Sequence, residues 1–327
     1  MAWIKRLFGP RAPENPREEP AAHEELPPIT SIAADQTGWK VPILDVRPVT
    51  QGLLSTTTDP KMAANSVSFS NEDGLTFAGQ KPASRRVVAA DLQYGVDGKI
   101  CDGVLFNPEE MEHKWALYFH GGRIIVVRSW TRRVWLVAET RTVTDGIRID
   151  RIQGSVYRDD EPASFTIQAF DFLIASHAMR LIWPAPIPRE VSPDDRDAAL
   201  WVMNCFGSLA EAATRSDLVA LPPKRLLRTD SLLHIAAARG QLGEIQRLIE
   251  GGYPVDLRSR TGLTALHWAI QVGGVDAATR LLDLGADVNC VVPHVGSPLL
   301  HATGRGHKKM EAMLKARGGV SLDPPRA

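Results

Sequence analysis

The amino-acid sequence predicts a multi-domain protein, with an N-terminal α+β domain built on a mainly antiparallel sheet and a C-terminal all-α solenoid of repeats. Three observations support this prediction. Four columns of residues in the last third of the chain recur with one 33-residue period. In the middle of the chain, two runs of β-branched and aromatic residues flank a Gly-Gly pair. A segment rich in proline and glutamate separates the first residues from both regions.

Length and composition limit the class of protein. A chain of 327 residues is long enough for about two domains. With 44% hydrophobic and 23% charged residues, it has the composition of an ordinary globular protein. Lysine plus arginine and aspartate plus glutamate both number 38, so the net charge is zero. Because such a chain lacks a global positive field, we expect no nucleic-acid partner.

Neither a transmembrane helix nor a secretory signal is predicted. The most apolar stretch, 170–187, carries Asp171, His177 and Arg180 and then runs into Pro184 and Pro186, so it is a poor membrane span. The only three cysteines are Cys101, Cys205 and Cys290, which form no metal-spaced pair and no disulfide framework. We therefore expect a cytoplasmic protein with no metal site.

Residues 1–35 are predicted to be a disordered segment. Six prolines and five glutamates lie between Pro10 and Pro28, and such a stretch buries too little surface to fold. The first nine residues are expected to form a tethered amphipathic peptide that docks weakly on a membrane surface or on a partner. A frayed terminus is the alternative, because so short a helix is marginal in isolation. The apolar residues of this peptide are Trp3, Ile4, Leu7 and Phe8.

Residues 36–190 are predicted to form the α+β domain, because short apolar runs alternate there with turn signals. The clearest hairpin turns at Gly121-Gly122, since two glycines permit the positive φ angles of a tight turn. Asp97-Gly98 is a second hairpin signal. A helix with apolar residues at helical spacing is expected after Pro162. The expected strands are 66–70, 86–94, 115–120, 123–130, 133–138 and 147–152.

Residues with matching roles recur along the last third of the chain at one spacing. A hydroxyl residue at a helix start accepts from free backbone N–H groups, and a glycine after a helix supplies a left-handed C-terminal cap. Residues of both kinds recur here every 33 positions, which predicts stacked helix pairs that share a core. The columns are Ser231, Thr264 and Ser297; Leu233, Leu266 and Leu299; Gly240, Gly273 and Gly306; and Gly252, Gly285 and Gly318.

This period, with the motifs at 231–234, 264–267 and 297–300, resembles the ankyrin-repeat family. The resemblance implies repeats at 229–260, 262–293 and 295–322. Leu200 and Gly207 extend the columns backwards, which implies a degenerate capping repeat at 193–221. The motif histidines His234 and His267 are then expected to bridge backbone groups of neighbouring loops, so a metal role is disfavoured. Because repeats draw stability from their neighbours, we expect the solenoid to fold without the N-terminal domain.

Ankyrin repeats bind proteins through their β-turn fingers and the concave side of their first helices. The resemblance therefore implies a protein partner. The third finger, 290–295, is unusually apolar for a solvated loop, which favours either a partner surface or a contact with the N-terminal domain. The partner-binding positions mapped by motif are Arg239, Arg258, Arg260, Thr261, Leu263, Gln271, Val272, His294 and Arg305.

The N-terminal domain resembles uncharacterised bacterial proteins through Met-Glu-x-Lys-Trp at 111–115 and Arg-Ser-Trp-Thr at 128–131. No activity follows from this resemblance. Charged and hydroxyl groups beside two tryptophans predict a possible site for an anionic or aromatic ligand. An ion pair beside core tryptophans is the alternative. The residues of this possible ligand site are Glu112, Lys114, Trp115, Arg128, Ser129, Trp130 and Thr131.

Known catalytic signatures are absent from the sequence, so we predict no catalytic residue and no cofactor. The first functional hypothesis is an adaptor that binds a protein partner through the fingers and concave face of the solenoid. The second is an enzyme or small-ligand-binding domain at 36–190, which the repeats bring to its target.

Overall fold

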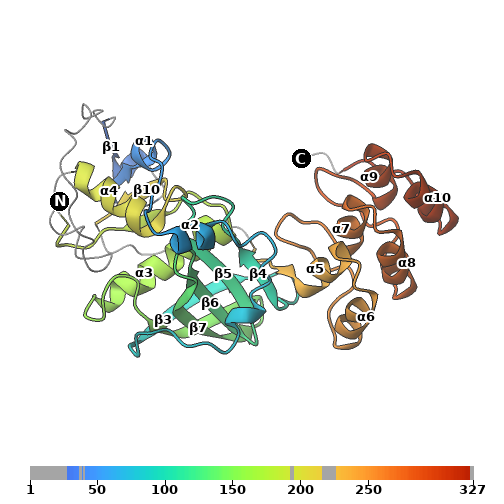
Figure 1. Cartoon of the computed structure of the whole chain (residues 1–327), viewed down its shortest axis with the longest axis horizontal. Coiled ribbons are helices and arrows are strands. Elements are labelled where there is room, and N and C mark those ends of the chain that lie inside the picture. Colours follow the sequence, from blue (N-terminus) through green and yellow to red (C-terminus); the bar gives the residue numbers. More distant parts are fainter. Residues whose placement is uncertain (1–27, 37–38, 40, 192–194, 216–225, 325–327) are drawn as a thin grey trace.

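The computed structural model describes residues 28–324, apart from 37–38, 40, 192–194 and 216–225. A sheet-rich part, here called the sheet lobe (28–215), is followed along the long axis by a helical part, the repeat lobe (226–324) (Figure 1). The N-terminal peptide of Trp3, Ile4, Leu7 and Phe8 lies outside the described residues, so its docking stays a prediction. Strand β1 (Thr30–Ile32) falls within the segment 1–35 that was expected to be disordered.

Six strands of the sheet lobe and one strand of the repeat lobe, β11 (Asp230–Ser231), form a seven-stranded sheet in which all neighbouring strands are antiparallel. The strands, in order across the sheet, are β11, β4 (Gly103–Phe106), β5 (Trp115–His120), β6 (Arg123–Arg128), β7 (Arg133–Val143), β8 (Gly146–Gly154) and β3 (Val87–Gly95). The hairpin between β5 and β6 turns at Gly121 and Gly122, whose φ angles of +56° and +72° suit glycine.

Both faces of this sheet are covered. Successive side chains of a strand point to opposite faces. On β5, Leu117 and Phe119 join an apolar cluster that includes helices α3 (Ala163–Leu173) and α4 (Asp195–Phe206). Tyr118, between them, joins a second cluster with Phe69. Burial on both sides explains why β5 and β6 read as continuous apolar runs.

A smaller sheet and several short helices complete the sheet lobe. The small sheet has the order β1-β2-β10-β9, and its last pair is parallel. Helix α3 continues into a π-helical segment, Ile174–Ala178. The remaining strands are β2 (Ile43–Asp45), β9 (Pro184–Pro186) and β10 (Ala212–Thr214). The short helices are α1 (Arg47–Thr50), α2 (Pro60–Ser66) and the 3-10 segments Ala34–Gln36 and Leu75–Phe77.

The repeat lobe consists of three helix pairs with one shared core. The first helices of the pairs follow one another in one row and the second helices in another (Figure 1). Thr264 and Ser297 cap their helices by accepting from the backbone N–H groups of His267 and Leu300. The first helices are α5 (Leu232–Ala238), α7 (Ala265–Gln271) and α9 (Pro298–Gly304). The second helices are α6 (Leu242–Glu250), α8 (Val275–Asp283) and α10 (Lys308–Ala316).

Three local expectations differ from the structure. Residues 66–70, expected as a strand, are the last residue of helix α2 and the turn after it. Asp59 caps that helix and Pro60 occupies its first position. Asp97-Gly98 does not close a hairpin, since β3 and β4 lie at distant places in the sheet. Helix α4, expected to open a capping repeat at 193–221, instead buries Trp201 in the core of the sheet lobe.

Candidate partner-binding site

The two lobes are joined through a shared sheet. Strand β11, at the start of the first repeat, pairs with the edge strand β4, with Asp230 opposite Val104 and Ser231 opposite Gly103. The backbone N–H of Leu232 donates to the carbonyl of Asp102 over 2.9 Å. A Cβ atom added to Gly103 would lie 2.3 Å from the carbonyl oxygen of Asp230, so the close approach of β11 requires glycine.

Two arginines of the repeat lobe stabilise this joint. The guanidinium of Arg260 donates to the carboxylate of Asp230 over 2.8 Å and to the carbonyl of Leu105 over 3.0 Å. Its side chain is only 21% exposed. The guanidinium of Arg239 donates to the carboxylate of Asp73 over 3.2 Å and to the carbonyl of Asn71 over 2.7 Å. The sheet lobe therefore covers one end of the row of first helices.

A groove of about 600 Å³ lies where the first helices meet the sheet lobe. The indole Nε1 of Trp268 is buried and has no hydrogen-bond partner among the described residues. An unpaired buried N–H group is costly, so this indole offers a donor to an incoming acceptor. The groove is lined by Val67, Ser70, Asn71, Glu72, Val104, Asn107, Pro108, Glu109, Asp230, Ile235, Ala238, Arg239, Arg260 and Trp268.

The surface of the first helices repeats with the 33-residue period. We define the first-helix face by two columns: Ile235, Trp268 and His301, and Arg239, Val272 and Arg305. Equivalent rings make equivalent contacts, because Trp268 lies 5.6 Å from the ring of His234 and His301 lies 5.9 Å from the ring of His267. The sheet lobe contacts the first residue of each column, Ile235 and Arg239, while Val272 and Arg305 are exposed.

The motif histidines connect each repeat with the next. The Nε2 atom of His234 lies 3.0 Å from the carbonyl of Leu257 and 3.1 Å from that of Leu263. The Nε2 atom of His267 lies 3.3 Å from the carbonyl of Gly296. Burial lowers the pKa of both imidazoles, and that of His267 falls to about 4. Each ring is thus a neutral bridge between loops.

A family model described as ankyrin repeats (3 copies) matches residues 218–292. This part of the chain consists of ankyrin repeats. The resemblance inferred from the 33-residue period and the histidine motif is thereby confirmed, and ankyrin repeats support a role in protein–protein interaction.

Three curated relatives are similar to this chain. The B-cell lymphoma 3 protein homolog of Mus musculus is 33% identical over 91 residues, 26% of this chain and 20% of that protein. The nuclear factor NF-kappa-B p105 subunit of Gallus gallus is 36% identical over 90 residues, 27% of this chain and 9% of that protein. The ankyrin repeat and KH domain-containing protein mask-1 of Caenorhabditis elegans is 35% identical over 78 residues, 24% and 3% of the two chains.

The chain spans no more than a fifth of the length of any of these three relatives. What those proteins do as wholes therefore does not carry over. All three come from animals, so they lend no support to the bacterial family that the sheet lobe was predicted to resemble. That resemblance stays a prediction.

The structure distributes the nine predicted partner-binding residues over three environments. Arg239 and Arg260 contact the sheet lobe, as described above. Arg258 is half-buried and donates to the carbonyls of Gly262 and Val291 within the ankyrin repeats. Leu263 is also half-buried. The positions that are exposed apart from Arg239 are Thr261, Gln271, Val272, His294 and Arg305.

The apolar third finger packs mainly within the ankyrin repeats. Val292 is fully buried and pairs with Gly296 across the finger. Arg258 of the preceding finger contacts Cys290 and Val291. Only Pro293 and His294 at the tip are exposed. The finger is thus apolar because it rests on its neighbours.

The residues of the predicted ligand site lie close together in the structure, but most of their polar atoms form hydrogen bonds with other residues of the chain. Lys114 lies over the ring of Trp130, 4.0 Å from its centroid, and contacts Ser55 and the carbonyl of Met111. The two indole N–H groups, of Trp115 and Trp130, donate to backbone carbonyls over 2.8 Å each. Burial, followed by the charge of Arg128, lowers the pKa of Lys114 to about 7.

The remaining members of this cluster also bind neighbouring segments. Glu112 accepts from the backbone N–H of Ser55 over 2.7 Å, and the hydroxyl of Ser129 donates to the carbonyl of His113 over 2.9 Å. Arg128 donates to two backbone carbonyls at the end of α4. The hydroxyl of Thr131 is buried without a partner among the described residues. A ligand role for this cluster stays a proposal.

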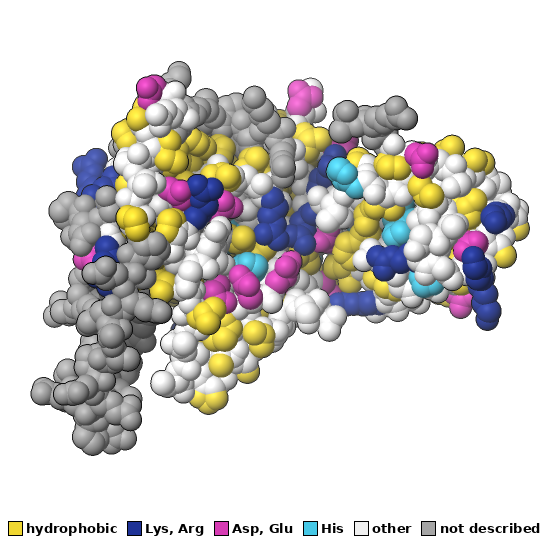
Figure 2. Space-filling model, turned by 90° about the horizontal axis from the view of Figure 1, so that it is seen from above, with side chains coloured by type: hydrophobic (Ala, Val, Ile, Leu, Met, Phe, Trp, Pro, Cys, Tyr) yellow, Lys and Arg dark blue, Asp and Glu magenta, His cyan; other side chains and the backbone are white. Residues whose placement is uncertain are grey.

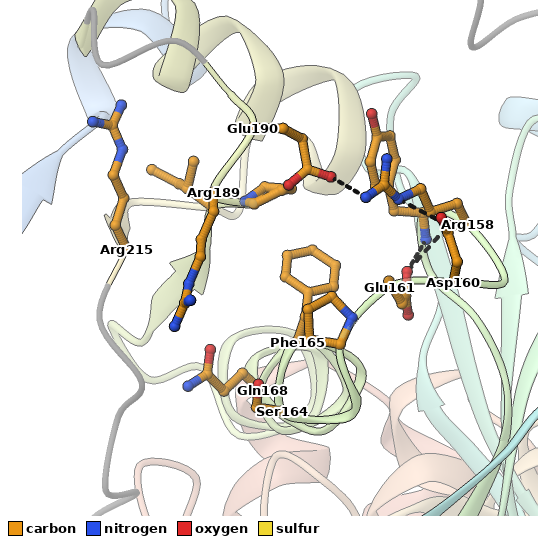
Figure 3. A pocket seen from close by; sticks show the side chains of 13 residues that line it. Arg158, Asp160, Glu161, Ser164, Phe165, Gln168, Arg189, Glu190 and Arg215 are labelled. Carbon is orange, nitrogen blue, oxygen red and sulfur yellow. Dashed lines mark hydrogen bonds and ion pairs between the residues drawn. The ribbon is translucent and has the colours of Figure 1, made fainter.

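A separate pocket of about 270 Å³ opens beside α3 and was not predicted (Figure 3). Phe165 lies at the start of α3, while Arg189 and Arg215 lie across the pocket on other segments (Figure 3). Arg158 on its rim pairs with Asp160 over 2.9 Å and with Glu190 over 2.7 Å. Its residues lie in parts of the sequence without a motif, so nothing in the sequence pointed to it.

The sequence did not predict that residues of both lobes line the groove. The signal for the first-helix face was present, because Ile235, Trp268 and His301 share the 33-residue period. The turn at 67–72 has no repeated sequence pattern that would predict its position beside the first helices of the ankyrin repeats. Over the described ranges, no helix has the length and apolar character needed to cross a membrane.

Proposed function

We propose that this chain is an adaptor that binds a protein partner on its first-helix face, with the sheet lobe forming a second wall of the same site. The ankyrin repeats support the interaction role. The observation that carries the location is the groove beside Trp268, whose indole N–H lacks a partner among the described residues. Val67, which lines the groove, is 57% exposed on the sheet lobe. Val272, one helical turn after Trp268, is 56% exposed on the first-helix face.

We expect the partner to complement this site in both polarity and shape. An acceptor from the partner satisfies the indole of Trp268, and its apolar side chains cover Val67 and Val272. Removing a side chain of this size from water contributes about 1.5–3 kcal/mol, and buried aromatic anchors at an interface often contribute more than their neighbours. Figure 2 shows hydrophobic and histidine side chains at the surface of the repeat lobe, which fits a face that a partner covers.

The test compares two exposed valines. Val272→Asp places a charge on the first-helix face, and Val87→Asp places the same charge on β3, where the valine is 59% exposed. Binding proteins are identified with the wild-type chain as bait, and their affinities are then measured with purified components. We expect Val272→Asp to weaken binding at least tenfold and Val87→Asp to leave it unchanged. A partner that binds both variants like the wild type contradicts the proposed site.

The second hypothesis from the sequence, a small-ligand-binding domain, has its best location in the pocket beside α3. The apolar floor at Phe165 and the arginines around it suit a small ligand with an anionic group. Thermal-shift screening of the full chain against phosphate, nucleotides and carboxylates tests this alternative, since a ligand of the folded state raises the melting temperature. A shift that Arg189→Ala abolishes would favour it.

We include a cytoplasmic location in the proposal. The three cysteines are free thiols. Burial raises the pKa of Cys101 to about 11 and that of Cys205 to about 12, so both remain protonated and unreactive at neutral pH. Such thiols are typical of proteins that function in a reducing compartment.

A further inference from the structure

The sheet lobe itself shows what chemistry the first-helix face accepts. On the first repeat, Ile235 packs against the apolar cluster that contains Phe69 and Phe77. One turn further along, Arg239 receives the carboxylate of Asp73 over 3.2 Å. In the first repeat, the residue of the first column thus contacts apolar side chains, and the residue of the second column contacts a carboxylate.

The next two repeats present the equivalent positions, of which Val272 and Arg305 are exposed and Trp268 and His301 are half-buried among the described residues. Trp268 takes the place of Ile235 and His301 follows it, while Val272 and Arg305 follow Arg239. Arg305 is exposed, and within the described part of the chain its side chain makes no ion pair or hydrogen bond. In the second column, Arg239 of the first repeat is paired with Asp73. Arg305, at the same position of the third repeat, has no such acidic partner among the described residues.

Two further nitrogen atoms gather beside Arg305. The Nδ1 atom of His301 and the Nε2 atom of His307 are buried and lack partners among the described residues. The ring of His307 lies against Gly273, next to Val272. The backbone N–H of Arg305 donates to the carbonyl of His301 over 3.1 Å, so the two residues are one helical turn apart. Burial, followed by the charges of Arg305 and His307, lowers the pKa of His301 and favours its neutral ring.

We infer that the second and third repeats bind an acidic segment of the protein partner, with a carboxylate on Arg305 beside His301 and His307 and an apolar side chain over Trp268 and Val272. This inference rests on the proposed function and specifies the partner's chemistry. The carboxylate accepts charge-assisted hydrogen bonds from the exposed guanidinium of Arg305, beside the two imidazole rings. It repeats, two repeats further along, the contact that Asp73 makes with Arg239.

The test is selection from a random dodecapeptide phage library with the full-length chain as bait. Three variants are selected in parallel: Arg305→Glu, Val272→Asp and Lys315→Glu. Lys315 is exposed on the second helix α10, so Lys315→Glu matches the charge change of Arg305→Glu away from the first-helix face. Circular dichroism melting curves establish that every bait is folded. Affinities of the selected peptides are then measured by fluorescence anisotropy.

We expect the wild-type chain and Lys315→Glu to select peptides rich in Asp and Glu. Arg305→Glu should weaken these peptides at least fivefold, with a smaller loss at high salt because exposed charges are screened. If Val272→Asp abolishes binding but Arg305→Glu does not, the face binds peptides and the acidic anchor is refuted. If Val272→Asp also binds normally, or no peptide is selected, the proposed function itself fails.

Discussion

The role of Arg260 in the structure differs from the role that the repeat motif predicts. From the repeat motif it is a finger residue, which is expected to be exposed. In the structure its guanidinium contacts Asp230 and the carbonyl of Leu105, and so connects the second finger with the sheet lobe. The contact spans 155 positions of sequence, from Leu105 to Arg260, so no local pattern could reveal it.

Arg260→Glu should therefore destabilise the protein. The change replaces an ion pair with two facing carboxylates and removes the donor to Leu105. Breaking a half-buried pair of this kind costs on the order of 2–4 kcal/mol. Arg305→Glu, at an exposed position, should change the free energy of unfolding by about 0.5 kcal/mol or less. Urea denaturation of both variants measures the difference, and equal midpoints would contradict the structural role of Arg260.

The buried histidines make stability depend on pH. Burial lowers the pKa of His267 to about 4, below the value of about 6.5 that it has when unfolded. The unfolded chain then binds more protons, so the contribution is complete above pH ~6.5 and is lost as the pH falls towards 4. For His267 alone this amounts to roughly 3 kcal/mol at most.

Urea denaturation at pH 7.5 and pH 5 measures this dependence. We expect the wild type to lose stability between these values and His267→Gln to lose less, because glutamine does not titrate. His294→Gln changes an exposed residue at the tip of the third finger and should keep the wild-type pH dependence. A pH dependence that His267→Gln leaves intact would assign the effect to other groups.

Among the elements, strand β11 determines how the two lobes meet. It is two residues long, yet it adds the start of the first repeat to the edge of the seven-stranded sheet. The edge of β4 is thereby covered, which removes an exposed strand edge. The absence of a side chain at Gly103 is what allows the two backbones to approach.

Gly103→Ala should consequently loosen the joint. Its Cβ would lie 2.3 Å from a backbone oxygen that has no freedom to move within the strand. We expect faster hydrogen exchange at residues 230–238 and a loss of about 1–3 kcal/mol. Gly243→Ala, in helix α6 with open space around it, should be neutral or slightly stabilising. Unchanged exchange at 230–238 in Gly103→Ala would show that the pairing does not hold the repeats in place.

Elements with strong local signals were predictable from the sequence. The hairpin around Gly121-Gly122 combines a turn with two apolar arms, and the ankyrin helices repeat at a fixed spacing. Helix α4 was assigned to the wrong neighbours, because Leu200 and Gly207 match the 33-residue columns by spacing while Trp201 and Phe206 pack into the sheet lobe. The groove was not predictable, because it depends on tertiary contacts and not on any period.

At the scale of the whole molecule, the sheet lobe acts as the cap of the ankyrin repeats. It covers Ile235 and Arg239 at one end of the first-helix face and leaves the later repeats accessible (Figure 1). A stack of repeats needs a terminal element to shield its first core face. Here the sheet-rich lobe packs against the first repeat, so we expect a partner on the first-helix face to contact both lobes.

The repeats should therefore be less stable alone than the sequence suggested. A fragment of residues 226–327 loses the contacts of Ile235, Arg239 and Arg260 with the sheet lobe. We expect its free energy of unfolding to fall by roughly 2–4 kcal/mol relative to the same repeats in the full chain. A fragment that begins at residue 192 also exposes the apolar side of α4 and should aggregate. Calorimetry of each fragment beside the full chain measures these effects, and matching transitions would contradict the capping role.

Photo-crosslinking tests most directly whether the first-helix face is the binding surface. Benzoylphenylalanine replaces Val272 on that face in one full-length protein, and Lys315 on the second helix α10 in another. Each is irradiated with the bound peptide or partner, and the products are separated by mass. The account predicts efficient crosslinking from position 272 and little from position 315. Crosslinking from position 315 alone would place the partner on the second helices and contradict it.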